Sequence, residues 1–424
     1  MSLTILFAAV ALASGAAPLP RPTNVPELMR TFAGEPVKSL ETWEKVRKPE
    51  IRQRFLERMY GVRPAAAEKP DVSFAPAEPD REMPDGQAVR KRVKISYRGP
   101  YGESSFVATA FIPKSDRPVP AFVLICNRDP KENLDPDRKV KSDFWPVEQI
   151  VARGYAAIAF FNGDVAPETY NPATAFLSGV FACYERPQDR TDRSWGTLSA
   201  WAWGASRVLD WIETEPLLDA KRVAVVGHSR GGKTSLLAGA TDERWAMTCV
   251  NDSGCGGAKL ANVDLPASEY YAIFLGSRVT YWFCGAFQKY CMNHDRHIER
   301  IDAWKDRWPF VCEPLSVDQH QWAAMVAPRL LAIGSATEDH GAGPLGEFYT
   351  ALLASPAWEH YGRRGLAGDE FPPPMAPVAG GDVSYHLRAG KHDLTAYDWS
   401  VYMDFADRHG WRQAQSAGRE GTCE

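Results

Sequence analysis

The stretch 227–231, GHSRG, holds the residue type and spacing best suited to nucleophilic chemistry. It fits the pattern G-x-S-x-G, with an apolar run before it and a helix-forming run after it, the setting that this pattern requires. The glycines are needed because the serine sits on a strained turn, where a side chain two positions away would collide with backbone. The turn also places the hydroxyl at a helix N-terminus, where N–H groups favour developing negative charge. We therefore predict that Ser229 is a nucleophile.

Nine histidines compete for the role of general base. In chains with such an elbow, an acid and then a histidine follow the serine along the chain. His392 follows the last strand-like segment, in YHLRAGKHDLTAYDW, and a helix-forming run comes after it. His386 lies within that strand, His409 lies too far into the last helix, and His228 adjoins the nucleophile and should face away from it. We predict that His392 takes the proton of Ser229.

Two carboxylates are candidates for the acid that supports this base. Asp339 follows the strand-like run LLAIGSA, and Asp252 ends the run after the nucleophile helix, in VNDSGCGG. Either carboxylate could accept a hydrogen bond from the second imidazole nitrogen and stabilise the imidazolium ion. We favour Asp339, where the fold usually carries its acid, and keep Asp252 as the alternative. The other is expected to lie beside the site as a polar neighbour.

The elements that must position these side chains read as alternating strands and helices. Short, continuously apolar runs predict six strands, at 120–127, 155–163, 222–228, 245–252, 328–336 and 382–390. Helical patterns lie between or after them, at 143–154, 198–213 and 397–410. Such an alternation indicates a mostly parallel sheet covered by helices on both faces.

The N-terminal part of the chain adds an amphipathic helix and a hairpin. Residues 38–60 place Leu40, Trp43, Val46, Ile51, Phe55 and Met59 near helical spacing. The runs 88–99 and 104–114, separated by the turn signal GPYGE, predict an antiparallel hairpin. A hairpin leading into a parallel sheet predicts an α/β-hydrolase, a three-layer sandwich. The irregular segments 165–195, 261–327 and 359–380 are expected to wall its active site.

Composition bounds the partners and the compartment. The 424 residues carry a formal net charge of −4, which gives no indication of nucleic acid or an anionic membrane as a partner. An apolar stretch, Leu3–Ala13, precedes small residues and Pro18, as in a secretory signal, and no later run is long enough to span a membrane. We expect a signal peptide at 1–17, one exported α/β-hydrolase domain at 18–424, and a monomer.

Cysteines and histidines give little sign of a metal site. None of the eight cysteines forms a CxxC pair, and one or two disulfides are plausible in an exported protein. His294 and His297 lie three residues apart, which alone is weak support for metal binding. We expect neither a metal nor an organic cofactor.

Several separate motifs between about residues 90 and 410 resemble one known family, the glucuronoyl esterases, in their bacterial form. The similar blocks are GHSRGGK, NDSGCGGA, YWFCGAFQKY, VDQHQWAAMVAPR, SATEDHGAGPLGEF and GKHDLTAYDW. The resemblance implies that Arg230 stabilises the oxyanion, that Lys233 bonds sugar hydroxyls and that Glu269 contacts the sugar. The implied substrate is a (4-O-methyl-)glucuronate ester on glucuronoxylan, including a lignin–carbohydrate ester.

The chain departs from the family pattern at three places. Asp252 stands where fungal members have Glu, and bacterial members can use an acid at the Asp339 position instead. Gly341 stands where the family often has a sugar-stacking Trp. His228 and Asp393 stand where fungal members have two cysteines that form a disulfide.

Three other functions remain open. An acetyl-xylan or feruloyl esterase would share the triad, but it has no use for a Lys-plus-Arg arrangement suited to an anionic sugar. A serine peptidase of this fold usually adds a large N-terminal propeller, whereas only about 100 residues precede the sheet here. A non-catalytic binding protein would lack a member of the triad, and all three residue types are present in order.

Overall fold

The computed structural model describes residues 22, 25–169, 171, 174–261, 268–269, 280–290 and 316–412. The signal peptide predicted at 1–17, His294 and His297 lie outside the described residues, as does most of the segment 261–327. Among the described residues, no helix is both long and apolar enough to cross a membrane.

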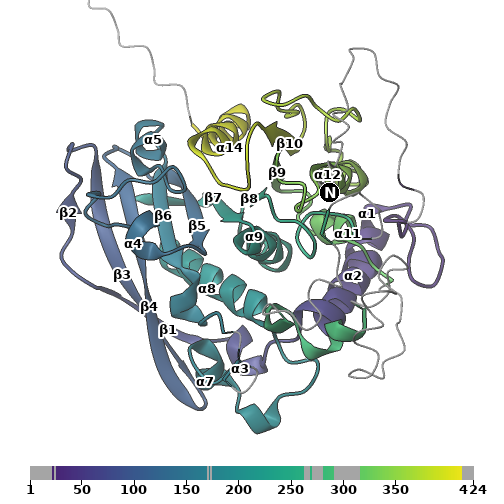
Figure 1. Ribbon diagram of the computed structural model, residues 1–424, viewed down its shortest axis with the longest axis horizontal. Helices are drawn as coiled ribbons and strands as arrows, with labels where there is room; N and C mark the ends of the chain where they lie inside the picture. The colour runs from purple at the N-terminus through teal and green to yellow at the C-terminus, as the bar shows by residue number, and fades with distance from the viewer. Residues whose placement is uncertain are drawn as a thin grey trace, which may run out of the picture.

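A ten-stranded sheet forms the centre of the molecule (Figure 1), in the order β1-β3-β4-β6-β5-β7-β8-β9-β10 with β2 paired to β3. The six strands from β6 to β10 in this order run parallel, while β1 to β4 and the β4–β6 pair are antiparallel. The six predicted strands and the predicted β3–β4 hairpin are confirmed. The strands are β1 Asp71–Pro76, β2 Arg81–Glu82, β3 Ala88–Gly99, β4 Gly102–Pro113, β5 Val119–Cys126, β6 Ala156–Phe161, β7 Leu218–His228, β8 Met247–Asn251, β9 Leu330–Ala336 and β10 Val383–Arg388.

Helices cover both faces of the parallel strands (Figure 1). On one face lie α5 (Val147–Ala152) and α14 (Ala396–Arg408), and on the other α8 (Thr197–Ile212), α9 (Arg230–Thr241) and α12 (Pro344–Ala354). Alternate residues of β5 serve the two cores: Phe122 and Leu124 pack on the first side, Val123 and Ile125 on the second. Because both faces are buried, this strand reads as a continuous apolar run.

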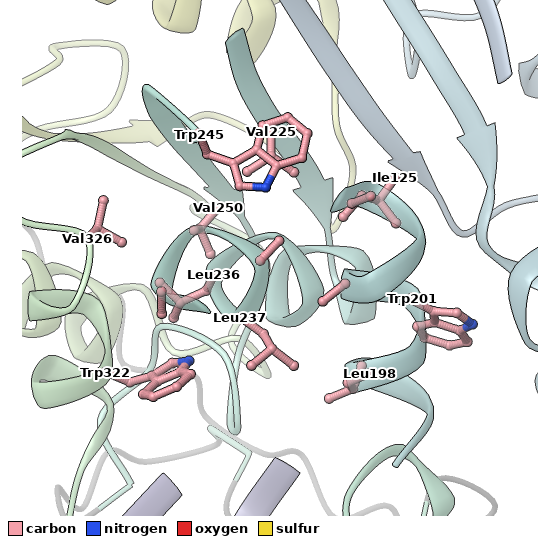
Figure 2. Close-up of a cluster of buried hydrophobic side chains, with 14 of the residues drawn as sticks. Ile125, Leu198, Trp201, Val225, Leu236, Leu237, Trp245, Val250, Trp322 and Val326 are labelled. Atoms are coloured by element: carbon pink, nitrogen blue, oxygen red, sulfur yellow. The ribbon is translucent and has the colours of Figure 1, made fainter. Parts of the chain in front are cut away.

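Helix α9, which follows the predicted nucleophile, is packed on several sides (Figure 2). Leu236 and Leu237 of α9 lie in one buried cluster with Val225 of β7 and Trp201 of α8. Trp322, from α11 (Gln319–Ala324), belongs to the same cluster, and all five side chains are fully buried. This packing on three elements fixes where the first turn of α9 can lie.

The remaining short helices lie in the connections. They are α3 (Ala65–Glu68), α4 (Pro130–Asn133), α6 (Asn162–Val165), α7 (Val180–Tyr184), α13 (Pro356–Glu359) and the 3-10 turns Pro187–Asp189, Thr280–Trp282 and Gly285–Tyr290. The segment 359–380 covers the open edge of β10 through bridges from Leu366 to Val383 and from Val378 to Tyr385. The segment therefore covers a sheet edge, and its expected role as a wall of the active site stays a prediction.

The helix predicted over 38–60 is present as one helical run with two π-helical segments. It comprises α1 (Leu40–Thr42), Trp43–Arg47 in π form, α2 (Lys48–Phe55) and Leu56–Tyr60 in π form. The predicted apolar face is partly wrong, because Leu40 and Val46 are 39% and 43% exposed.

The buried face of this run follows a strict repeat of four, Trp43, Arg47, Ile51, Phe55 and Met59. At 3.6 residues per turn such a repeat drifts by about 40° per step around the helix. The wider π turns, with hydrogen bonds from i to i+5, reduce that drift and keep the five side chains on one face.

The five described cysteines, Cys126, Cys183, Cys249, Cys255 and Cys284, are buried free thiols. The other three, Cys291, Cys312 and Cys423, lie outside the described residues. The expectation of one or two disulfides therefore finds no pair among the described cysteines.

Buried and exposed apolar residues of the first helical run are expected to differ in their contribution to stability. Phe55 is fully buried, with its ring centroid 4.7 Å from that of Trp322. We expect Phe55→Ala to lower the free energy of unfolding by about 3–5 kcal/mol, measured by urea denaturation. Leu40→Ala is the matched control and should change it by less than about 0.5 kcal/mol. Equal losses for the two variants would contradict this register.

Candidate active site

Ser229 occupies the turn between β7 and α9, in the predicted strand–turn–helix elbow. Its backbone lies at φ 57° and ψ −124°, a conformation that costs free energy for a residue with a side chain. The turn is held by the Ser229 N–H, which donates to the carbonyl of Asn251 at 2.9 Å. A Cβ at Gly227 would overlap the carbonyl oxygen of Gly231, so the close approach of these two residues requires glycine at 227.

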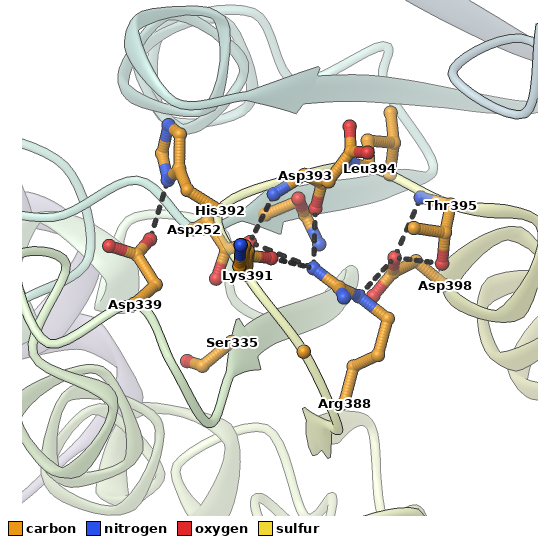
Figure 3. Close-up of polar contacts among 12 residues, drawn as sticks. Asp252, Ser335, Asp339, Arg388, Lys391, His392, Asp393, Leu394, Thr395 and Asp398 are labelled. Carbon is orange, nitrogen blue, oxygen red and sulfur yellow. Dashed lines mark hydrogen bonds and ion pairs between the residues drawn. The ribbon is translucent and has the colours of Figure 1, made fainter.

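His392 lies in the loop between β10 and α14 and is paired with Asp339 (Figure 3). Its Nδ1 lies 2.5 Å from Oδ2 of Asp339, which follows β9. The imidazole is 43% exposed, while the Asp339 side chain is only 10% exposed. The structure thus brings the predicted base together with the acid that we favoured.

Asp252, the alternative acid, lies beside this pair but is bonded differently. Ligand atoms of Asp252, Asp339 and His392 lie within 4.8 Å of one another, the one such group that could hold a metal ion among the described residues. Oδ2 of Asp252 lies 3.4 Å from Arg388 Nη2 and from the N–H of Asp393, and Oδ1 has no hydrogen-bond partner there. Burial, and then the nearby carboxylates, raise the pKa of Asp252 well above its usual range.

Arg388, at the end of β10, holds the loop that carries His392 (Figure 3). Its Nη2 donates to the carbonyls of Lys391, at 2.7 Å, and Asp393, at 2.9 Å, which flank the histidine. Its Nε forms an ion pair with Asp398 at 3.0 Å. The sequence analysis did not single out Arg388. A signal was present, because a charged residue ending an otherwise buried strand is rarely buried unless it is paired.

His228, next to the nucleophile, is a buried neutral imidazole. Its Nδ1 lies 2.7 Å from Oδ1 of Asn251, and its Nε2 lies 3.4 Å from Nη2 of Arg128. Because a guanidinium only donates, Nε2 accepts and Nδ1 carries the proton. Burial, followed by the proximity of His392, lowers the pKa of His228 well below its usual range. We expected His228 to face away from Ser229; its ring centroid lies 4.4 Å from that of His392, a contact that the sequence did not indicate.

Arg128, just after β5, connects the neighbours of the nucleophile and the base. Its Nη1 lies 2.7 Å from Oδ1 of Asp393, and its Nη2 contacts His228. The guanidinium also lies 4.3 Å from the ring centroid of Phe144. In this chain Arg128 therefore connects His228 and Asp393, which stand where fungal members of the similar family have two cysteines.

Arg230 begins α9, and two groups contact its guanidinium. Nη2 donates to the carbonyl of Asn127 at 2.7 Å, and Nε lies 3.1 Å from Oε2 of Glu168. Glu168 also accepts a hydrogen bond from the indole N–H of Trp282 at 3.0 Å. Among the described residues, no hydrogen bond or ion pair engages Nη1 of Arg230, the residue that directly follows Ser229.

Lys233 and Glu269, both predicted to contact a sugar, lie near each other. The Nζ of the buried Lys233 donates to the carbonyl of Ser253 and lies 3.9 Å from Oε2 of Glu269. It also lies 5.9 Å from the ring centroid of Trp282. The Glu269 N–H donates to the carbonyl of Gly341 at 2.8 Å, which ties this short segment to the loop that carries Asp339.

The backbone around Gly341 leaves room for the Cβ of a side chain. A Cβ there would lie 3.5 Å from Asp339 Oδ1 and 3.8 Å from Glu269 Cγ, which are ordinary contacts. The missing indole at this position is therefore a chemical difference at the site. A different indole, that of Trp282, lies close to Lys233 and Glu168.

Glu347, on α12, is a buried carboxyl that the sequence analysis did not identify. Its Oε1 accepts from the N–H groups of Ser253 and Gly254, at 2.8 and 3.0 Å, and from the Ser253 hydroxyl at 2.7 Å. Its Oε2 lies 2.6 Å from the hydroxyl of Ser335. Burial raises the pKa of Glu347 to about 7. Glu347 thus fixes the turn that follows Asp252. The Ser253 carbonyl that accepts a hydrogen bond from Lys233 belongs to this turn.

This raised pKa predicts a pH-dependent stability. Between pH 4.5 and about 7, folded Glu347 holds a proton that the unfolded chain has released. The contribution of the protonated carboxyl to the free energy of unfolding is therefore fully present below pH 4.5 and is lost as the pH rises through 7. Glu347→Gln mimics the protonated form, with its NH2 donating to Ser335. We expect the variant to match wild type at about pH 4 and to exceed its free energy of unfolding by up to about 3 kcal/mol at pH 8.5. Denaturation at a series of pH values measures this, and a constant difference between the two proteins would contradict it.

Comparison with known proteins identifies the family. A sequence model described as "Glucuronyl esterase, fungi" matches residues 102–362, more than half of the chain. A carbohydrate esterase from an unknown prokaryotic organism is 33% identical over 417 residues, which cover 91% of this chain and 89% of that protein. The 4-O-methyl-glucuronoyl methylesterase of Cerrena unicolor is 29% identical over 216 residues, 50% of this chain and 41% of the fungal enzyme.

Solved structures agree with these relatives. A promiscuous esterase of carbohydrate esterase family 15 from a marine bacterial metagenome is 32% identical, with a TM-score of 0.76, covering 92% of this chain and 98% of that one. The glucuronoyl esterase of Solibacter usitatus is 29% identical, with a TM-score of 0.75, covering 91% of this chain and 98% of that one. The α/β-hydrolase fold and the family resemblance are therefore confirmed, and this chain belongs to the glucuronoyl esterase family.

Proposed function

We propose that this carboxylic ester hydrolase cleaves esters of (4-O-methyl-)glucuronate on xylan, with Ser229 as the nucleophile. The observation that carries the proposal is the 2.5 Å contact between His392 Nδ1 and Asp339 Oδ2, close to the strained serine turn, in a chain of this family. Curated relatives are described as 4-O-methyl-glucuronoyl methylesterases, which supports the same class of substrate here.

The proposed reaction is a two-step acyl transfer. His392 Nε2 takes the Ser229 proton as the hydroxyl oxygen attacks the ester carbonyl, because Nδ1 is already engaged by Asp339. The oxyanion is stabilised by Nη1 of Arg230 and by N–H groups at the start of α9. The alcohol leaves with the proton from His392. Water then attacks the acyl-enzyme by the same route and releases the uronic acid.

Asp339 is our choice for the acid of the triad. It contacts the imidazole directly, whereas the oxygens of Asp252 have only 3.4 Å contacts or none. The raised pKa of Asp252 also favours its neutral form, which stabilises an imidazolium ion less well than a carboxylate does. Asp252 is then a neighbour that adjusts the field around the pair.

Lys233 and Glu269 are proposed to bond hydroxyl groups of the sugar.

A second candidate function is hydrolysis of other carbohydrate esters, such as acetyl-xylan, by the same Ser229, His392 and Asp339. Gly341 favours this candidate, because the site lacks one aromatic contact that would select a glucuronate ring. The relative described as promiscuous is in keeping with it.

We propose in addition that residues 1–17 direct export and that residues 18–424 form one catalytic domain. The apolar run Leu3–Ala13 followed by Pro18 supports the export signal. The single ten-stranded sheet supports one domain.

The first test compares two substrates. Wild type is expected to hydrolyse benzyl glucuronate strongly and p-nitrophenyl acetate weakly, and Ser229→Ala should lower kcat for both by at least about 10³-fold. Initial rates at saturating substrate measure this. Acetate cleavage without glucuronate cleavage would support the second candidate function, and unchanged rates in Ser229→Ala would contradict the nucleophile.

A second test separates the two acids. Asp339→Asn is expected to lower kcat for benzyl glucuronate by about 10³- to 10⁴-fold, because the amide cannot stabilise the imidazolium ion. Asp252→Asn, the matched control, should lower it by about tenfold or less. Full pH–rate profiles of both variants measure the difference, and the opposite ranking would identify Asp252 as the acid.

A further inference from the structure

Each of the two cations nearest the nucleophile faces a glutamate. Arg230 Nε lies 3.1 Å from Glu168, and Lys233 Nζ lies 3.9 Å from Glu269. The sequence analysis treated this Lys-plus-Arg arrangement as suited to an anionic sugar. In the structure each of these two positive charges also faces a carboxylate of the protein.

Glu168 is built into the site and is not an incidental surface acid. Its Oε2 faces Arg230, its Oε1 accepts the indole N–H of Trp282, and its side chain is only 20% exposed. Two donors that cannot accept a hydrogen bond therefore converge on the two oxygens of one carboxylate. A neutral amide at this position has a single acceptor oxygen for the same two donors.

Glu269 is fixed through its backbone. Its N–H donates to the carbonyl of Gly341 at 2.8 Å, and its own carbonyl accepts from Nζ of Lys259 at 2.5 Å. Lys259 and Asp339 lie beside this segment and add one charge of each sign. Among the described residues, Arg230 and Lys233 therefore offer N–H donors whose positive charge is offset by a neighbouring carboxylate.

This balance matters because the reaction changes the charge of the acyl group. The carboxyl of a uronate ester is neutral, whereas the product is a carboxylate anion at neutral pH. Two unpaired cations would bind the anion more tightly than the ester, and the product would be released slowly. Cations already paired with glutamates still donate to hydroxyl and carbonyl oxygens but attract the anion less.

We propose that Glu168, together with Glu269, makes the site selective for the neutral uronate ester over the uronate anion. This inference rests on the proposed function and adds a specificity-determining role for a residue outside the triad. Glu168 then acts on product release through the charge of Arg230, and Glu269 acts through Lys233.

The test measures binding in a Ser229→Ala background, in which the ester is not consumed. Dissociation constants for methyl glucuronate and for glucuronate are measured by calorimetry at low salt. We expect the ester to bind more tightly than the acid in Ser229→Ala alone. Adding Glu168→Gln should tighten glucuronate binding by about tenfold and change ester binding by less than about twofold. The gain should shrink at high salt.

Two further variants separate charge from shape. Glu168→Asp keeps the negative charge and should retain the parent ratio of ester to acid affinity. Glu269→Gln should shift the ratio in the same direction as Glu168→Gln but less, since its pair is longer and its side chain is 38% exposed. In the active enzyme, Glu168→Gln should lower the inhibition constant of glucuronate.

Equal changes for acid and ester, no change for either, or an acid that already binds as tightly as the ester would overturn the proposal. A loss of discrimination in Glu168→Asp equal to that in Glu168→Gln would also overturn it. These outcomes are distinct from failure of the proposed function, which appears as absent Ser229-dependent hydrolysis of benzyl glucuronate by the wild type.

Discussion

The buried guanidinium of Arg388 sets the position of the proposed base. His392 lies in a loop, and a loop has no hydrogen-bond ladder of its own to hold it. Arg388 replaces that ladder by donating to the carbonyls on both sides of the histidine. Its charge is tolerated in the interior because it also pairs with Asp398 and approaches Asp252. The end of β10, the start of α14 and the turn after β8 therefore meet at one cation.

Three carboxyl groups around this loop have different partners. Asp339 contacts the imidazole of His392. Asp252 has long contacts to Arg388, and burial dominates its pKa. Glu347 accepts backbone and hydroxyl donors, which offset part of the cost of burial and leave its pKa at about 7. The same residue chemistry thus yields the proposed acid of the triad and two buried carboxyl groups whose pKa values are raised.

Ion pairs do much of the positioning in this site. Arg128 connects His228 to Asp393, and Glu168 connects Arg230 to Trp282. The charged side chains of the Arg128–Asp393 and Arg230–Glu168 pairs are partly exposed, so each pair contributes modestly to the free energy of folding. Their importance is geometric and electrostatic: they orient the cations near Ser229 and set the net charge that an ester and its acid product meet.

The sequence by itself determined the parallel strands, the β3–β4 hairpin, the elbow at Ser229 and the candidates His392, Asp339 and Asp252, because these depend on local patterns and on order along the chain. Tertiary structure alone decided that Asp339 rather than Asp252 contacts the imidazole. It also decided the contacts of Arg388, Glu347, Arg128 and Glu168, and which apolar residues of the first helical run are exposed. Most of these contacts join segments that are distant in the chain, as in the pairs Arg388–Asp252, Glu347–Ser253 and Arg128–His228. No local pattern of residues specifies such a meeting.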